Sequence, residues 1–104
     1  MKEKVCIMNR LDEIKQNLIN QKPILKDNYK INLLGIFGSY VRGEQNQGSD
    51  LDILVDYEDT PSLITLIQIE NELGELLGVK VDLVTFKGIK PQLKDIILDE
   101  VVYL

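Results

Sequence analysis

Histidine is absent from this sequence, and cysteine occurs once, as Cys6. Without an imidazole, the chain lacks the base of a serine or cysteine hydrolase triad and the histidine ligands of zinc enzymes. A single cysteine cannot form an internal disulfide, and beside Val5 and Ile7 it is best explained as a small apolar side chain. Any proton transfer must therefore use carboxylates.

Long apolar runs are also absent. The apolar stretches are far shorter than the roughly 20 residues that cross a bilayer, and the N-terminus lacks the apolar core of a secretory signal. We therefore expect a cytoplasmic protein without a membrane partner. With 104 residues, 44% of them hydrophobic and 28% charged, the chain fits one domain, residues 1–104.

Positive charge is scarce, with 12 basic residues against 17 acidic ones and a net charge of -5. Such a surface repels a phosphate backbone, so we expect no direct binding of nucleic acid. A protein or a metal-complexed nucleotide fits the charge better as a partner.

Hydrophobic periodicity predicts an α/β (α+β) fold, with a small mixed β-sheet flanked by helices. The expected strands are residues 31–37, 51–57 and 79–85, each bounded by turn-forming residues. Asn9 is a candidate cap for a first helix, and Pro23 is expected to open a second short helix that reaches Tyr29. Two later helices are expected. One should begin at Thr60-Pro61 and end at Gly78, and the other should begin at Pro91. The residues expected to face inward in the helix before Gly78 are Leu63, Leu66, Ile67, Leu73 and Leu77. In the helix after Pro91 they are Leu93, Ile96 and Ile97.

The last four residues, 101–104, are apolar or aromatic. We expect them to pack on the domain's own core, with a partner interface as the alternative.

Two carboxylates, Asp50 and Asp52, stand at the entry of the second strand. Alternate residues of a strand share a face, so the two acids should emerge together, with their Cα atoms about 7 Å apart. Their mutual repulsion should raise one pKa unless a cation compensates it. Oxygen ligands without nitrogen or sulfur favour Mg²⁺ or Mn²⁺ over zinc. Asp82, within the third strand, completes a site of three carboxylates if the two strands are neighbours.

Gly38-Ser39 follows the first strand, and a glycine and a hydroxyl at the start of a helical turn can present N–H groups to phosphate. Arg42 adds a guanidinium for phosphate or for an acidic neighbour, although a solvated surface charge explains it as well. Ser49 is either a turn residue or a group that positions Asp50 or phosphate.

Gly38-Ser39, ten intervening residues and Asp50-Leu51-Asp52 form the pattern GSx10DxD. This pattern resembles the signature of the DNA polymerase β-like nucleotidyltransferase superfamily. More narrowly, residues 38–59 and the final KPQLKDIILDEVVYL resemble the minimal nucleotidyltransferases (MNT) that act as antitoxins beside HEPN-domain toxins.

The resemblance implies that Asp50 and Asp52 bind two Mg²⁺ ions and that Asp82 is a metal ligand and general base. It implies that Gly38 and Ser39 hold the phosphates of ATP. The implied reaction moves AMP from ATP onto a tyrosine of the cognate HEPN ribonuclease toxin and silences it.

Two other functions stay open at this point. One is a non-catalytic antitoxin that binds and occludes the toxin, and the other is a nucleotidyltransferase acting on a small-molecule hydroxyl. Tyr40 and Tyr57 flank the expected site and could stack on a base, but packing is the more usual role of such residues.

Overall fold

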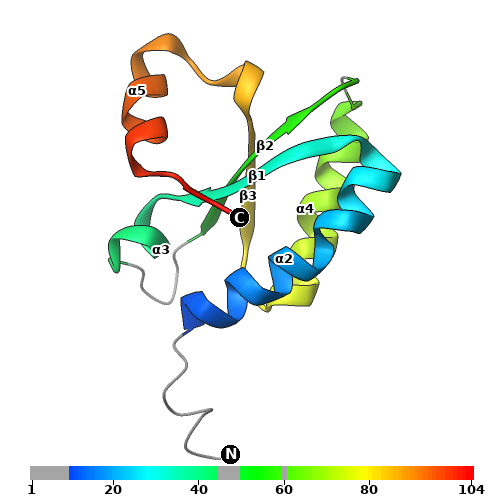
Figure 1. Cartoon of the computed structure of the whole chain (residues 1–104), viewed down its shortest axis with the longest axis horizontal. Helices are drawn as coiled ribbons and strands as arrows, with labels where there is room; N and C mark the ends of the chain where they lie inside the picture. Colours follow the sequence, from blue (N-terminus) through cyan, green and yellow to red (C-terminus); the bar gives the residue numbers. More distant parts are fainter. Residues whose placement is uncertain (1–9, 45–49, 60) are drawn as a thin grey trace, which may run out of the picture.

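The computed structural model describes residues 10–44, 50–59 and 61–104. Along these ranges helices and strands alternate in a mixed arrangement (Figure 1), which confirms the expected fold class. The elements are α2 (Arg10–Tyr29), β1 (Ile31–Phe37), α3 (Ser39–Arg42), β2 (Leu51–Tyr57), α4 (Leu63–Leu77), β3 (Val81–Thr85), the 3-10 turn η1 (Phe86–Gly88), α5 (Pro91–Glu100) and β4 (Val102–Tyr103).

The strands form one sheet in the order β3-β2-β1-β4. β1 is antiparallel to both β2 and β4, whereas β2 and β3 are parallel. A parallel pair needs a crossover connection, and α4 supplies it. Strands β1 and β2 have the expected bounds, while β3 begins at Val81, after the expected start at Val79.

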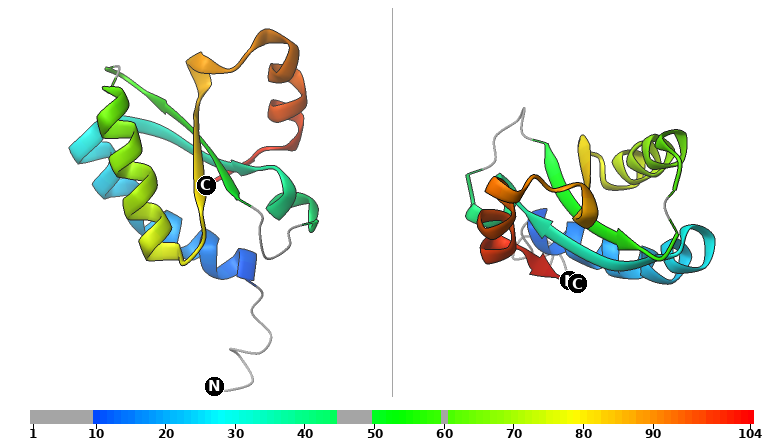
Figure 2. Two further views of the ribbon diagram at one scale, coloured as in Figure 1. Left: turned by 180° about the vertical axis from the view of Figure 1, so that it is seen from behind. Right: turned by 90° about the horizontal axis from the view of Figure 1, so that it is seen from above.

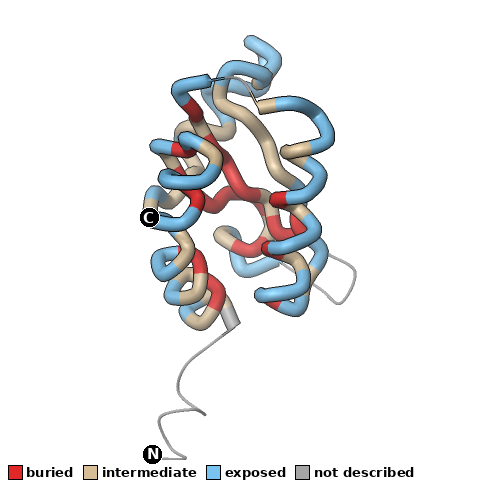
Figure 3. The backbone as a smooth tube through the Cα atoms, turned by 90° about the vertical axis from the view of Figure 1, so that its right-hand side faces the viewer, coloured by how far each residue is buried: buried red, intermediate tan, exposed pale blue. Residues whose placement is uncertain are grey.

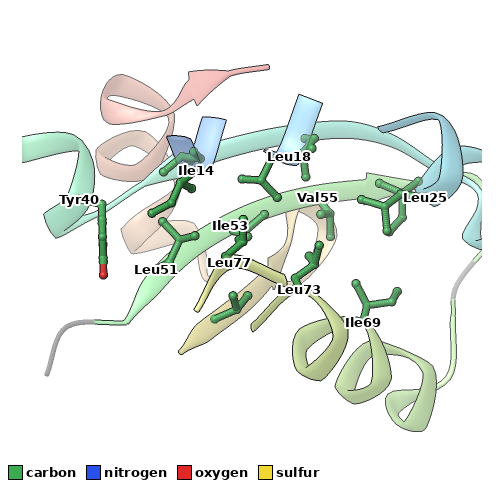
Figure 4. Packing of buried hydrophobic residues seen from close by; sticks show 14 residues of the cluster. Ile14, Leu18, Leu25, Tyr40, Leu51, Ile53, Val55, Ile69, Leu73 and Leu77 are labelled. Atoms are coloured by element: carbon green, nitrogen blue, oxygen red, sulfur yellow. The ribbon is translucent and has the colours of Figure 1, made fainter. Parts of the chain in front are cut away.

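One face of the sheet carries the core. Leu51, Ile53 and Val55 alternate along β2 and are each 0% exposed. They pack against apolar residues of α2 and α4 (Figure 4). These two helices lie side by side, whereas α5 lies apart from both of them (Figures 1 and 2). Burial is accordingly concentrated along the central strands and the inner faces of α2 and α4 (Figure 3).

The expectation of two short N-terminal helices is wrong, because α2 continues through Pro23 as a single helix. Ile14, Leu18 and Leu25 keep one apolar face across the proline, and all three are buried on the sheet. Pro23 itself is exposed, so packing of that face outweighs the hydrogen bond that the proline removes. The expected cap, Asn9, lies outside the described residues.

Helix α4 begins at Leu63, two residues after Pro61 of its expected opening. Ser62 is its N-cap and accepts a hydrogen bond from the Thr65 N–H at 3.1 Å, and Gly78 ends it in the left-handed conformation, as expected. Leu73 and Leu77 face the core as predicted, and Ile69 joins them at 0% exposed. Leu63 and Ile67 were expected inside but are exposed, because they lie to one side of the helical stripe that Ile69, Leu73 and Leu77 form.

Helix α5 begins at Pro91 as expected but buries none of its residues. The predicted inward residues Leu93 and Ile96 are exposed, a correction that follows from the distance between α5 and the core face. The chain then enters β4, and Leu104 packs against the core cluster, its N–H donating to the Leu34 carbonyl at 2.9 Å. Within the described ranges, no helix combines the length and the apolar character needed to cross a membrane.

Candidate functional site

The candidate acids lie at one end of the central strands. Asp52 is the register partner of Asp82 across the parallel pair β2–β3, so the two residues occupy adjacent strands at the same level. Asp50 comes directly before β2 and is partly exposed. Asp82 is exposed rather than buried, because β3 is an edge strand of the sheet. The strand pairing that a three-carboxylate site requires is therefore present.

The surroundings of Asp52 raise its pKa to about 6 from the ordinary value of 3.8. Partial burial is the largest cause, followed by the negative charges of Asp82, Asp50 and Glu100, while Arg42 acts in the opposite direction. The site therefore gathers negative charge around Asp52, which a bound cation would offset.

The turn after β1 lies against this acid. Phe37 pairs with Asp52 across β1 and β2, and a Cβ atom added to Gly38 would overlap the Asp52 carboxylate. Gly38 also has φ 86° and ψ -156°, a conformation that only glycine adopts without strain. Glycine thus lets the backbone of the turn approach Asp52 directly.

Ser39 begins α3, a helix of four residues that Gly43 ends in the left-handed conformation. The Gly38 carbonyl accepts from the N–H groups of Val41 and Arg42 at 3.1 and 3.2 Å. The helical turn predicted after Gly38-Ser39 is therefore formed, and it is located beside Asp52.

Arg42 is engaged by acidic neighbours. Its Nε donates to Glu44 at 2.8 Å, and its Nη1 donates to the Glu100 carboxylate. The other Glu100 oxygen accepts from the Gly38 N–H at 3.1 Å. The sequence interpretation missed Glu100, and no local signal could have found it, since the chain separates it from Gly38 by 62 positions.

The remaining candidates have other positions. Ser49 lies outside the described residues. Tyr40 is buried in the core cluster, and Tyr57 is buried at the opposite end of β2, where it pairs with Ile31. Packing therefore accounts for both tyrosines, and neither is available to stack on a base.

The donor set fits a hard divalent cation, since it consists of carboxylates on adjacent strands. Within the part of the chain that the structure describes, no three acidic side chains already converge tightly enough to enclose an ion. A cation at this place must therefore draw the three side chains together, and the exposure of Asp82 and the partial exposure of Asp50 leave them room to rotate.

Cavity volume does not point to the site. A hollow of ≈ 410 Å³ lies between α2 and the first half of β1 and contains none of the candidate residues.

Comparison with known proteins identifies the same region. The sequence model of the protein family described as nucleotidyltransferase domain matches residues 18–104. The protein adenylyltransferase MntA of Thermococcus cleftensis is 44% identical over 97 residues, an alignment that covers 93% of this chain and 98% of MntA.

Solved structures agree with the sequence comparison. A chain of a toxin–antitoxin complex with AMP-PNP matches with a TM-score of 0.73 and 29% identity, covering 92% of this chain and 72% of that chain. A chain from the complex of the tri-AMPylated Shewanella oneidensis HEPN toxin with MNT antitoxin matches with a TM-score of 0.66 and 26% identity. That match covers 86% of this chain and 70% of the other.

The matched family region includes every strand of the sheet and all the candidate site residues. These matches confirm the resemblance found in the sequence. The chain belongs to the nucleotidyltransferase domain family, and it is a nucleotidyltransferase.

Proposed function

We propose that this protein is an antitoxin that transfers AMP from Mg-ATP onto a tyrosine hydroxyl of a cognate HEPN ribonuclease toxin in the cytoplasm and so inactivates the toxin. The observation that carries the proposal is the pairing of Asp52 with Asp82 beside the Gly38 turn. The relatives support it, because one is named a protein adenylyltransferase and another chain comes from a complex of a tri-AMPylated HEPN toxin with MNT antitoxin.

In this proposal, Asp50, Asp52 and Asp82 hold two Mg²⁺ ions, or Mn²⁺ in their place. When bound, such ions neutralise the charge of the triphosphate and favour ionisation of the attacking hydroxyl. The negative charge that raises the pKa of Asp52 is the charge that these ions would compensate.

Gly38 and Ser39 are the proposed phosphate contacts. The Gly38 turn presents backbone to the space beside Asp52, and the Ser39 side chain at the start of α3 is partly exposed. Ser49 and Arg42 are secondary candidates, and Arg42 would have to contact phosphate while it remains close to Glu100.

The proposed reaction is a direct displacement at the α-phosphorus. The tyrosine oxygen forms a bond to that phosphorus, the bond to the bridging oxygen breaks, and pyrophosphate leaves with the electron pair. The proton of the tyrosine passes to the Asp82 carboxylate. The exposed position of Asp82 at the edge of the sheet leaves it accessible to a side chain of another protein.

Intact-mass spectrometry tests this function. The toxin that co-purifies with this chain is incubated with Mg-ATP and either the wild type, the double variant Asp50→Asn/Asp52→Asn, or a matched control, Asp27→Asn/Asp59→Asn. The control removes the same charge at exposed positions outside the candidate site. We expect one or more AMP masses on the toxin with the wild type and the control only. An unmodified toxin in all three reactions overturns the proposal.

Occlusion of the toxin is the second candidate function. Leu63 and Ile64 in the first turn of α4 are 71% and 75% exposed, which is apolar surface suited to contact with a partner. If the double variant neutralises the toxin as fully as the wild type, occlusion is the mechanism. If ATP is instead consumed only with a hydroxyl-bearing small molecule, the acceptor is not a protein.

A further inference from the structure

Glu100 joins the two ends of α3. Its Oε2 accepts from the N–H of Gly38, the residue before the helix, and its Oε1 accepts from Nη1 of Arg42, the last residue of the helix. Only 17% of the Glu100 side chain is exposed, compared with 48% of the Arg42 side chain. The carboxylate is therefore the less exposed partner, and it holds an arginine whose other ion pair, with Glu44, lies at the surface.

Sheet register places Glu100 at this position. β4 pairs with β1 through Gly35 with Tyr103 and Ile36 with Val102. Continuing this antiparallel register brings position 100 opposite position 38. The close approach depends on Gly35, where an added Cβ would lie 2.7 Å from Cγ2 of Val101. Glu100 is the last residue of α5, so the pairing of β4 that follows it fixes its backbone position beside Gly38.

Helix α3 needs such support. It has four residues, and a helix of that length is not stable by itself because its nucleation cost is not recovered. Gly38 has a half-buried N–H that requires an acceptor, and Glu100 provides a charged one. The same helix carries Ser39 and ends in Arg42, both of which the proposed function assigns to ATP phosphates.

We propose that Glu100 is a positioning residue of the transferase reaction, which fixes the Gly38–Arg42 segment against Asp52 by bridging the Gly38 N–H and the Arg42 guanidinium. The inference rests on the proposed function. Glu100 does not itself contact the reacting atoms; it acts through the segment that binds the phosphates.

A competing interpretation makes Glu100 a phosphate mimic that ATP must displace from the same two donors. The low exposure of Glu100 argues against it, since ATP would have to rotate away a side chain that is only 17% exposed. Removing a phosphate mimic should lower the KM for ATP, whereas removing a positioning residue should not, so kinetics separates the two.

The kinetic test compares Glu100→Gln and Glu100→Ala with the control Asp99→Asn, which neutralises the exposed neighbour on α5. Gln retains the size of the side chain but can accept only one of the two hydrogen bonds, so it tests the bridge with the least disturbance of folding. We expect kcat for AMP transfer to fall about 10- to 100-fold in both Glu100 variants, the loss typical when a residue that orients a ligand-binding group is removed. The KM for ATP should not decrease. Values within twofold of the control, or a lower KM, overturn the proposal.

A double-mutant cycle tests whether Glu100 acts through Arg42. On an Arg42→Ala background, Glu100→Ala should reduce kcat/KM by a smaller factor than on the wild-type background. Equal factors on both backgrounds contradict the bridge.

Hydrogen exchange at Gly38 gives a readout that does not depend on catalysis. In Glu100→Gln and Glu100→Ala, the Gly38 amide should exchange at least about tenfold faster by NMR, whereas the Ile53 amide at the centre of the sheet keeps its rate. An unchanged Gly38 rate overturns the positioning role. If the wild type transfers AMP to no acceptor, the proposed function fails, while this measurement still tests the bridge.

Discussion

Asp52 and Asp82 occupy the same level of two parallel strands, and the carboxylate of Asp52 also lies over the backbone of Gly38. The acid therefore adjoins a second carboxylate on one side and the proposed phosphate turn on the other. Its raised pKa is the electrostatic consequence of this position.

The first prediction concerns the pH dependence of stability without metal. The pKa of Asp52 is about 6 in the folded chain and 3.8 in the reference state, so between these values the folded state binds more protons than the unfolded state. The contribution of Asp52 to the free energy of unfolding should therefore be largest in acid and fall as the pH rises from about 4 to about 6. Asp52→Asn should remove this decline and melt at a higher temperature than the wild type at pH 8 in EDTA. Thermal melts from pH 4 to pH 8 check this, with Asp59→Asn as the control, and a lower melting temperature of Asp52→Asn at pH 8 contradicts it.

The second prediction concerns ligand binding. Mg-ATP that binds only the folded state should stabilise the wild type, by about 2.7 kcal/mol at a hundredfold excess over Kd. The Asp50→Asn/Asp52→Asn variant should gain nothing from Mg-ATP, although it folds. Differential scanning fluorimetry with Mg-ATP, ATP in EDTA and Mg²⁺ alone measures the effect. Equal stabilisation of the wild type and the variant would show that Mg-ATP binds outside the site formed by Asp50 and Asp52.

The third prediction compares two glycines with positive φ. Gly38 adopts φ 86° and has the Asp52 carboxylate in the path of any Cβ, whereas Gly43 adopts φ 73° with open space around it. Gly43→Ala should cost about 1 kcal/mol, from backbone strain alone. Gly38→Ala should cost about 2–3 kcal/mol and should also abolish stabilisation by Mg-ATP, because Asp52 must move. Chemical denaturation measures both, and equal costs would show that the Asp52 contact is unimportant.

The fourth prediction concerns the docking of β4. Gly35→Ala brings a methyl group against Cγ2 of Val101 and should destabilise the protein by about 1–3 kcal/mol. Adding Val101→Ala removes that side-chain contact and should restore part of the loss. If the double variant loses at least as much free energy of unfolding as the two single variants together, the clash is not with Val101.

Strands β1 and β2 were predictable because their apolar runs are short, bounded by turn residues and directly paired with each other. The pairing of β2 with β3, which brings Asp82 beside Asp52, was only a condition in the sequence and is shown by the structure. The DxD spacing itself placed Asp52 opposite the core face. Local pattern and tertiary packing agree at these positions, so the sequence was sufficient for them.

The helices were less predictable, because the face that a helix buries depends on where it meets the sheet. Pro23 marked a helix boundary by its local chemistry, yet the apolar face from Ile14 to Leu25 kept α2 continuous. Leu93 and Ile96 have helical spacing, but α5 lies away from the core face. Glu100 reaches the site only because β4 returns to β1, and no pattern near residue 100 reports that pairing.

The edge strand β4 joins the sheet through two register pairs, whereas β1 and β2 share six. Short pairing at an edge gives a low free energy of local opening compared with that of global unfolding. The α2–α4 core should therefore persist through brief excursions in which β4 separates from β1. During each excursion α3 would lose the carboxylate that joins its ends. With Glu100 in its proposed role, the equilibrium between paired and separated β4 would set the fraction of molecules competent for transfer.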